Sequence, residues 1–371
     1  MTQRPTLIVL PGDGIGPEVI GATLRIIDWF AKHRGFDCDL RIEQFGIQTY
    51  YDTGLFMRQG LMEDLMSADA VLFGALGSDV ENRGVSAKVR REQGLLSIRK
   101  HMQVFANLRP VKALAPLAGA SPLRPHITKG VDLIVVRELT GGMYFGEPRG
   151  VETLPDGERR GVNTHVYTST EIRRIARVAF ELARQRRNSV MSVDKANVME
   201  AGVLWREEVS RLHAREFADV RLEHMYADNA AMQLVRNPRQ FDVLLADNLF
   251  GDILSDEAAM ITGSLGMLPS ASLSEPDNGG RRRGFYEPVH GSAPDIAGQN
   301  KANPLGAVLS FAMALQLSFN RQGDARLLED AVLATLSQNV RTADIAESHS
   351  RIVSTTQMTD AIIHELDRTA R

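Results

Sequence analysis

The sequence has one cysteine, Cys38, among 371 residues, so an internal disulfide is impossible. A single thiol suits a reducing compartment, and we expect a cytoplasmic location. The longest apolar run near the start, residues 7–10, is shorter than a signal peptide's apolar segment of roughly 7–15 residues. No stretch approaches the ~20 apolar residues of a membrane helix, so we expect no membrane association.

No excess of one charge is present either. Lys and Arg total 43 and Asp and Glu total 46, which gives a net charge of −3. This balance lacks the basic footprint of nucleic-acid-binding proteins, so we expect no nucleic-acid partner. Gly (31) and Pro (15) occur at ordinary frequency, and 43% of the residues are hydrophobic. A chain this long and apolar can bury a large core, which excludes disordered and collagen-like classes.

Several common catalytic motifs are missing. The sequence has no G-x-x-x-x-G-K-[ST] phosphate loop, no G-x-S-x-G nucleophile elbow and no His/Cys spacing for zinc. The loop Gly12-x-Gly14-x-Gly16 departs from the dinucleotide fingerprint G-x-G-x-x-G, because Pro17 stands where the third glycine should be. We therefore do not assign a Rossmann fold from this loop.

The apolar pattern alternates between strands and helices, which predicts an α/β fold. Residues 6–10 read as a buried strand, and Pro17 and Glu18 favour a helix start that Gly35 ends. Thr168 and Glu171 have the spacing of a capping box before an amphipathic helix. Further strands are predicted at 37–45, 70–73, 131–136, 189–194, 220–226 and 241–246, and further helices at 198–212, 306–317 and 327–336. No linker-like segment marks a domain boundary, so discontinuous domains are possible. Residues 272–284, with Arg281 to Arg283, are predicted to be a solvated loop, with a binding patch as the alternative.

Two carboxylates, Asp252 and Asp256, follow a predicted strand at helical i, i+4 spacing. Carboxylates so close repel unless a cation or hydrogen bonds hold them. They suit Mg²⁺ or Mn²⁺, and Asp228 at the end of another strand could be a third ligand. The alternative is that one aspartate caps the helix and the other is solvated.

Arginines and a possible acid–base pair accompany these carboxylates. Arg99, Arg109 and Arg137 lie beside apolar segments, where guanidinium groups suit a di-acid substrate. Each could instead be a surface salt-bridge partner. Tyr144 lies in a glycine-rich segment and Lys195 follows a strand, and a lysine near other cations can act as a base. Read alone, they could be a core aromatic and a surface charge.

The segment 287–295 and Asn303 contain small residues whose exposed amides would allow a nucleotide to approach. Asp295 could accept a hydrogen bond from a ribose hydroxyl and would repel a 2′-phosphate, which favours NAD over NADP.

Together these segments resemble the isocitrate/isopropylmalate dehydrogenase family of β-decarboxylating dehydrogenases, and most closely its isopropylmalate branch. The matching segments run in the expected order: 10–18, 94–99, 106–110, 137–150, 192–198, 248–256, 263–271 and 287–303. The resemblance implies a two-domain, non-Rossmann α/β fold with the active site in the interdomain cleft. It implies a large nucleotide-binding domain at 1–104 and 263–371, and a smaller substrate and dimerisation domain at 105–262 with a dimer arm near 139–166.

The resemblance also implies an activity: NAD-dependent oxidative decarboxylation of 3-isopropylmalate in leucine biosynthesis by a homodimer with shared active sites. Lys195 would take the hydroxyl proton from across the dimer, and Tyr144 would protonate the enolate carbon. The implied binding residues are Arg99, Arg109 and Arg137 for the carboxylates; Leu95, Leu96 and Val198 for the isopropyl group; Asp252, Asp256 and the partner's Asp228 for Mg²⁺ or Mn²⁺; and Glu92, Asn197, Glu287, His290, Gly291, Ser292, Ala293, Asp295 and Asn303 for NAD.

The chain departs from the family pattern in two loops. Residues 77–82 replace the usual Gly-Gly-Pro-Lys-Trp, Arg91 stands where proline is usual, and 272–284 is longer than expected. No named catalytic side chain is lost. The alternatives to 3-isopropylmalate are the same chemistry on D-malate or tartrate, and a non-catalytic metabolite-binding paralogue.

Overall fold

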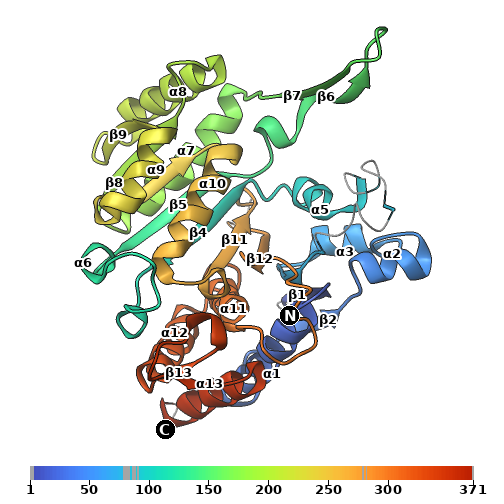
Figure 1. The fold of residues 1–371 in the computed structure, drawn as a ribbon, viewed down its shortest axis with the longest axis vertical. Coiled ribbons are helices and arrows are strands. Elements are labelled where there is room, and N and C mark those ends of the chain that lie inside the picture. Colours follow the sequence, from blue (N-terminus) through green and yellow to red (C-terminus); the bar gives the residue numbers. More distant parts are fainter. Residues whose placement is uncertain are drawn as a thin grey trace. The chain divides into compact units, whose positions relative to one another are not determined.

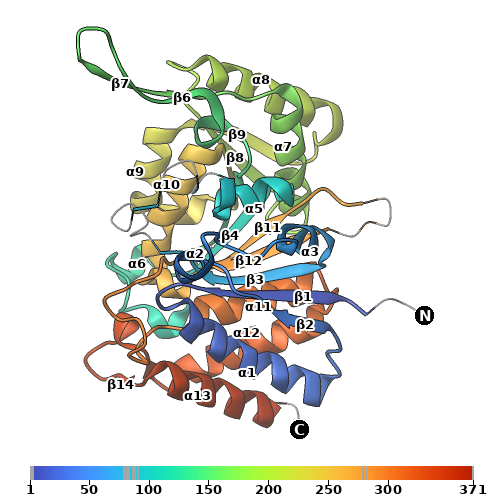
Figure 2. The same cartoon turned by 90° about the vertical axis from the view of Figure 1, so that its right-hand side faces the viewer.

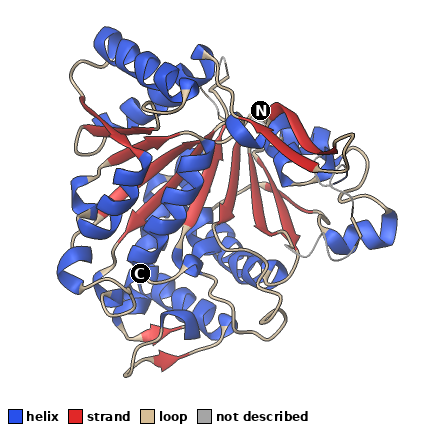
Figure 3. Ribbon diagram, turned by 45° about the horizontal axis from the view of Figure 1, so that its top comes forward, coloured by secondary structure: helices blue, strands red, loops and turns tan. Residues whose placement is uncertain are grey.

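The structure is a computed structural model that describes residues 4–77, 84–85, 89, 92–277, 280 and 282–369. The chain divides into two compact units. Unit 1 comprises Met1–Val104, Ala113–Lys129 and Ala259–Arg371, and unit 2 comprises Phe105–Lys112 and Gly130–Ala258. In each unit strands lie between helices, as an α/β fold requires (Figure 3).

The units differ from the predicted domain boundaries at residues 113–129 and 259–262, which the prediction places in the smaller domain and the structure groups with unit 1. The longer segment, 113–129, has clear contacts in unit 1. This segment belongs to unit 1 because its packing and hydrogen-bond partners lie there. The 3₁₀ turn η1 (Ala115–Leu117) packs against α12 (Gln322–Ser337), and Arg341 donates to the Pro116 carbonyl. The nucleotide-binding and dimerisation roles of the two parts stay predictions.

Unit 1 contains strands in the order β2-β1-β3-β12-β11. The first four run parallel, and β11 is antiparallel to β12. Their bounds are β1 (Thr6–Gly12), β2 (Asp39–Ile42), β3 (Ala70–Ala75), β11 (Pro269–Leu273) and β12 (Gly284–Pro288). Its other elements are α1 (Gly16–Arg34), α2 (Ile47–Thr53), α3 (Leu61–Ser67), α5 (Leu95–His101), α6 (Pro125–Thr128), α11 (Leu305–Leu317), α13 (Thr355–Thr369), β13 (Val340–Arg341), β14 (Arg351–Ile352), η4 (Met260–Thr262), η5 (Leu265–Met267) and η6 (Ala343–Ile345).

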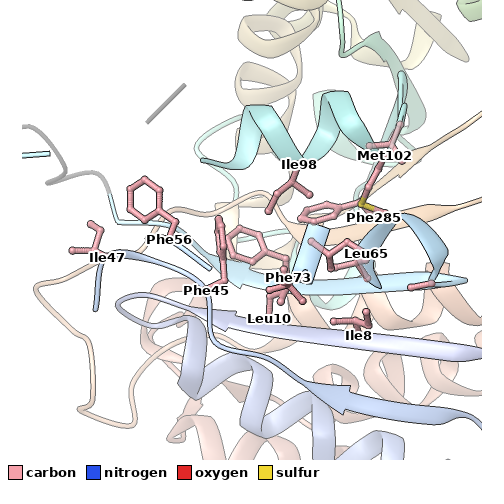
Figure 4. Close-up of a cluster of buried hydrophobic side chains, with 14 of the residues drawn as sticks. Ile8, Leu10, Phe45, Ile47, Phe56, Leu65, Phe73, Ile98, Met102 and Phe285 are labelled. Carbon is pink, nitrogen blue, oxygen red and sulfur yellow. The ribbon is translucent and has the colours of Figure 1, made fainter. Parts of the chain in front are cut away.

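Helices cover both faces of these strands, which explains why residues 7–10 of β1 and the whole of β3 are apolar and buried. On one face, α1 and α11 pack against the strands, with α12 and α13 beyond them (Figure 2). On the other face, α3 and α5 close a buried cluster in which Phe45, Phe73 and Phe285 meet Ile98 (Figure 4). This core fixes the position of α5, which carries Arg99.

The predicted start and end of α1 are confirmed. Pro17 lies in its first turn, and Gly35 ends the helix with φ +62°, a conformation that favours glycine. The strand predicted at 37–45 is shorter, because β2 is the edge of the sheet and leaves Leu40 and Ile42 exposed. Phe45 instead turns into the core.

Unit 2 contains strands in the order β4-β5-β10-β8-β9, where β4 is antiparallel to β5 and the rest are parallel. Helices α7 and α8 lie on one face, and α9 and α10 lie on the other (Figure 2). The bounds are β4 (Ala106–Lys112), β5 (Asp132–Glu138), η2 (Gly142–Tyr144), β6 (Gly146–Thr153), β7 (Arg159–Thr164), α7 (Ser169–Arg184), β8 (Ser189–Asp194), α8 (Glu200–Glu216), β9 (Arg221–Tyr226), α9 (Ala227–Arg236), η3 (Pro238–Gln240), β10 (Val243–Ala246) and α10 (Asn248–Ala259).

Two segments of unit 2 are the subject of local predictions, a capping box and a dimer arm. The capping box is confirmed, because Thr168 and Glu171 exchange side-chain and backbone hydrogen bonds at the start of α7. Within the range predicted as a dimer arm, β6 and β7 form an antiparallel hairpin that projects from the rest of unit 2 (Figure 1).

The two unusual loops are described only in part. Residues 78–83, 86–88, 90–91, 278–279 and Arg281 lie outside the described residues. The ends of 272–284 pair as strands, since Ser272 faces Phe285 and Leu273 faces Gly284. Arg282 and Arg283 are half-buried. In the described part of the chain, no helix is long and apolar enough to span a membrane.

Candidate active site

Arg109 and Arg137 project from neighbouring strands of unit 2. In β4, Asn107 and Arg109 are two residues apart, so their side chains share one face. Asn107 lies directly opposite Arg137 in the antiparallel ladder between β4 and β5. Both guanidinium groups therefore lie on the same face of the sheet, and both arginines are buried.

Asp252 and Asp256 lie one turn apart on α10 and meet these two arginines. Arg137 Nη1 forms an ion pair with Asp252, and Arg109 Nη1 lies 2.8 Å from Asp256 Oδ1. Arg109 Nη2 also lies 3.5 Å from Asp252 Oδ1. Burial raises the pKa of Asp256, and the neighbouring Asp252 carboxylate raises it further, against the opposing effect of Arg109.

The two carboxylates fit a divalent cation chemically. They are hard oxygen donors, and their side chains are 32% and 55% exposed. Burial disfavours the ionised form of Asp256, and a nearby positive charge would favour it. Among the described residues, no group of three His, Cys, Asp or Glu side chains is placed to hold a metal. Within the described chain, Asp228 therefore does not join Asp252 and Asp256 in such a group.

Tyr144 reaches the same cluster from η2. Its hydroxyl donates to Asp252 Oδ2 across 3.0 Å. Burial raises the pKa of Tyr144, and Asp252 raises it further. The backbone before Tyr144 lies against the ring of Tyr167, where a Cβ on Gly142 would come within 2.5 Å of the Tyr167 hydroxyl. Gly142 also has φ +70°, so both the backbone conformation and the close approach of Tyr167 favour glycine at this position.

Three polar residues that we did not predict hold the arginines in place. Asn107 Oδ1 accepts from Arg109 Nε at 3.0 Å, and Ser255 Oγ accepts from Arg109 Nη1 at 2.7 Å. Asn248 Oδ1 accepts from Arg137 Nε at 3.0 Å and from Nη2 at 2.8 Å. The sequence feature that could have identified Asn107 is its position two residues before an arginine in an otherwise apolar strand.

Lys195 and Asp228 form a second group in unit 2. Lys195 follows β8, and its Nζ lies 2.6 Å from Asp228 Oδ1 at the start of α9. The lysine holds the pKa of Asp228 below its usual range. The ring of Tyr226 lies 5.9 Å from Lys195 Nζ. Asn197 and Val198 follow on the surface, where Val198 is 70% exposed.

The predicted residues around Arg99 belong to unit 1. Arg99 Nη2 lies 2.5 Å from Glu287 Oε1, and both side chains are largely buried. The Nε of Arg99 is buried and has no hydrogen-bond partner within the described chain. Leu95 and Leu96 are half-buried at the start of α5, and Leu95 packs against the core cluster of Figure 4. Glu92 is exposed just before this helix.

The predicted nucleotide segment lies against the glycine loop after β1. Ile15 N donates to the Ser292 carbonyl at 2.8 Å, and a Cβ on Gly14 would lie 2.0 Å from that oxygen. Gly14 therefore allows the two loops to touch. Gly291 and Asp295 are exposed, and Ala293 has φ +37°.

His290, in the same segment, has a ring nitrogen without a hydrogen-bond partner among the described residues. Its Nε2 is buried without a partner in the described residues, and burial lowers the pKa of His290, which favours the neutral ring. Asn303 is buried, and its side chain accepts from Leu305 N and donates to Asp344. A neutral ring with an unpaired nitrogen fits a polar ligand such as a nucleotide.

Comparison with known proteins identifies the family. Residues 6–362 match the family described as isocitrate/isopropylmalate dehydrogenase. The chain is 54% identical to 3-isopropylmalate dehydrogenase 1 of Bradyrhizobium diazoefficiens over 99% of this chain and 97% of the relative. It is 52% identical to 3-isopropylmalate dehydrogenase of Gluconobacter oxydans over the full length of both chains.

Solved structures agree with this result. The structure resembles the crystal structure of isocitrate dehydrogenase from Methylococcus capsulatus with a TM-score of 0.84, at 30% identity over 98% of this chain and 99% of the other. It also resembles a β-decarboxylating dehydrogenase from Thermococcus kodakarensis with a TM-score of 0.76, at 32% identity over 98% and 96% of the two chains. The chain is an oxidoreductase that belongs to the isocitrate/isopropylmalate dehydrogenase family.

Proposed function

We propose that this enzyme oxidises 3-isopropylmalate with NAD and decarboxylates it to 4-methyl-2-oxopentanoate, a step of leucine biosynthesis. The relatives named 3-isopropylmalate dehydrogenase, at 50–54% identity, support this substrate. The observation that carries the proposal is the cluster of Arg109, Arg137, Tyr144, Asp252 and Asp256 in unit 2. The cluster combines guanidinium groups that can bind carboxylates, carboxylate oxygens that can bind a metal, and a tyrosine hydroxyl that can donate a proton.

Arg109 and Arg137 bind the malate carboxylates in this account, and Arg99 contributes a third guanidinium. Asn107 and Asn248 already fix the orientation of the first two, so little side-chain entropy is lost when the substrate binds. The ion pairs with Asp252 and Asp256 are exchanged for ion pairs with substrate. Such bidentate carboxylate contacts are among the stronger hydrogen bonds in proteins.

Asp252 and Asp256 would hold Mg²⁺ or Mn²⁺, together with Asp228 from a second copy of the chain. When bound, the cation would polarise the ketone and stabilise negative charge on its oxygen during loss of CO₂. The unit 1 segment of His290, Ser292, Asp295 and Asn303 would bind NAD, which would supply the hydride acceptor. Asp295 is exposed and can accept from a ribose hydroxyl.

Two side chains move protons. Lys195, contributed across the dimer, accepts the proton from the substrate hydroxyl during oxidation. Tyr144 donates a proton to the carbon that has lost CO₂. A tyrosine hydroxyl is protonated at neutral pH, as a proton donor requires, and the raised pKa of Tyr144 moves its ionisation further from neutrality. One proton is taken and one is returned, so the reaction yields ketoacid, CO₂ and NADH without a net proton.

The substrate's isopropyl group would lie against Leu95 and Leu96, with Val198 added from a second copy. A missing methylene in such a pocket changes discrimination by only ~1–3 kcal/mol, so related malates should react slowly.

A homodimer is part of this proposal. Met232 and Val235 on α9 and Ile253 on α10 are 60%, 47% and 56% exposed, and both helices lie on the same face of the unit 2 strands (Figure 2). The projecting β6–β7 hairpin also leaves Val151 65% exposed. Both features support contact with a second copy.

The test measures NADH formation with NAD and Mg²⁺ on 3-isopropylmalate, D-malate, tartrate and isocitrate in parallel. We expect the highest kcat/KM for 3-isopropylmalate. A clear preference for any of the other three acids would overturn the substrate assignment.

A further inference from the structure

Asn248 is a fully buried residue at the start of α10, just after β10, and no role was predicted for it. Its Oδ1 accepts two hydrogen bonds from Arg137, at 3.0 and 2.8 Å. Its Nδ2 donates to the carbonyl oxygens of Leu139 at 3.1 Å and Gly141 at 2.9 Å. Both amide hydrogens and both acceptor positions are therefore used, and the partners permit only one orientation of the amide.

These four contacts join two functional parts of the cluster. On one side is the guanidinium of Arg137, which also pairs with Asp252. On the other side is the backbone of Leu139 and Gly141, which leads directly into η2 and Tyr144. Asn248 thus links the guanidinium of Arg137 directly to the backbone that carries Tyr144.

The same backbone is held from its other side by Glu138 and Tyr167. Glu138 accepts from Gly141 N at 2.8 Å, and the Tyr167 hydroxyl donates to Glu138 at 3.3 Å. Asn248 N donates to that hydroxyl at 2.9 Å. All these groups are buried, so any one left unpaired would cost the full desolvation of a polar group.

We propose that Asn248 is a positioning residue that sets Tyr144 relative to Arg137 for the reaction. This inference rests on the proposed function and adds a requirement to it. The acceptor atom orients the substrate-binding cation, and the donor atom orients the loop that carries the proton donor. Losing the donor alone should therefore affect turnover more than substrate binding.

Asn107 provides a matched comparison. It is also a buried asparagine whose Oδ1 accepts from the Nε of a predicted substrate-binding arginine, here Arg109. It lies on β4, and Tyr144 lies on the separate turn η2. A variant at Asn107 should disturb the binding of a carboxylate and leave proton donation intact.

The experiment compares Asn248→Asp with Asn107→Ala in the full-length enzyme. Aspartate keeps the acceptor for Arg137, but it replaces the Nδ2 donor with an oxygen that repels the two carbonyls. Since misplacement by about 1 Å can cost 10²-fold in rate, we expect kcat of Asn248→Asp to fall ~10- to 100-fold while KM for the malate changes less than about threefold. Asn107→Ala should raise KM, with kcat retained.

A kcat for Asn248→Asp within about threefold of wild type, or a KM rise like that of Asn107→Ala, would overturn the inference. If Asn248→Asp does not fold, Tyr167→Phe keeps the ring and removes only the hydroxyl, and a lower kcat at unchanged KM is again expected. An unchanged kcat for Tyr167→Phe would contradict the inference.

The wild-type assay separates this inference from the proposed function. An inactive wild type would overturn the function, whereas an active wild type beside a fully active Asn248→Asp would overturn only the role of Asn248. A readout without substrate is the alkaline absorbance titration of Tyr144, isolated by subtracting Tyr144→Phe. It should shift in Asn248→Asp and stay in place in Asn107→Ala.

Discussion

The hydroxyl of Tyr144 lies 3.0 Å from Oδ2 of Asp252 and donates a hydrogen bond to it. The predicted proton donor and a predicted metal ligand therefore contact each other within one chain. The charge of Asp252 disfavours a second negative charge at Tyr144, in addition to the effect of burial.

Tyr144 should ionise at higher pH than a free tyrosine, whose pKa is about 10. An alkaline absorbance titration of wild type minus Tyr144→Phe measures this step. Asp252→Asn should move it to lower pH, because the neighbouring charge is removed. The unfolded chain releases the proton first, so this residue should make the free energy of unfolding fall as pH rises above about 10. Ionisation of Tyr144 at or below the pH at which free tyrosine ionises would contradict the account.

Gly251→Ala should weaken binding of the malate roughly tenfold, since it displaces Arg137, and a hydrogen bond to a charged group contributes about 1.5–3 kcal/mol. A Cβ at this position would lie 2.7 Å from Cγ of Arg137 and push the guanidinium from its place. Isothermal titration with 3-isopropylmalate measures the effect. The control is Gly323→Ala in α12, where a Cβ meets nothing within 4 Å. Equal affinities of the two variants would count against this placement of Arg137.

Much of this arrangement could be predicted from local sequence. The i, i+4 spacing of Asp252 and Asp256 requires only a helix, and the capping box of Thr168 requires only its own turn. The strand predicted at 37–45 is too long because its alternation does not reveal that β2 is a sheet edge. Edge strands can end early, since no neighbour on the open side extends the ladder.

Lys195→Met should lower kcat by ~10²-fold or more across the pH range, because the variant has no group to accept the hydroxyl proton. Initial rates of NADH formation between mildly acidic and alkaline pH provide the measurement. Lys129→Met, at an exposed position outside the site, is the matched control. Wild-type turnover by Lys195→Met would reject its role as the base.

Asp295→Lys combined with Ile296→Tyr should shift coenzyme preference from NAD toward NADP. Asp295 is exposed in the predicted nucleotide segment, and its charge would repel a 2′-phosphate. The ratio of kcat/KM for the two coenzymes is the quantity to compare. An unchanged ratio would show that Asp295 does not select the coenzyme.

The contacts of Asn248 illustrate what local sequence could not predict. Its partners Arg137, Leu139 and Gly141 are more than 100 residues away in the chain and meet it only because β5 and β10 pair in parallel. The grouping of residues 113–129 with unit 1 has a similar cause, since Pro116 meets Arg341 only in the folded chain. Sequence patterns identify residues with chemistry, and the sheet topology decides which polar neighbours orient them.

The most direct test of the account is the metal dependence of turnover on 3-isopropylmalate. The enzyme is freed of divalent cations with a chelator, the chelator is removed, and NADH formation is followed while Mg²⁺ is added. We expect turnover to be lost without the metal and restored by it in wild type, with Asp256→Asn requiring much more Mg²⁺. Equal rates before and after chelation would contradict the assignment of Asp252 and Asp256 as metal ligands.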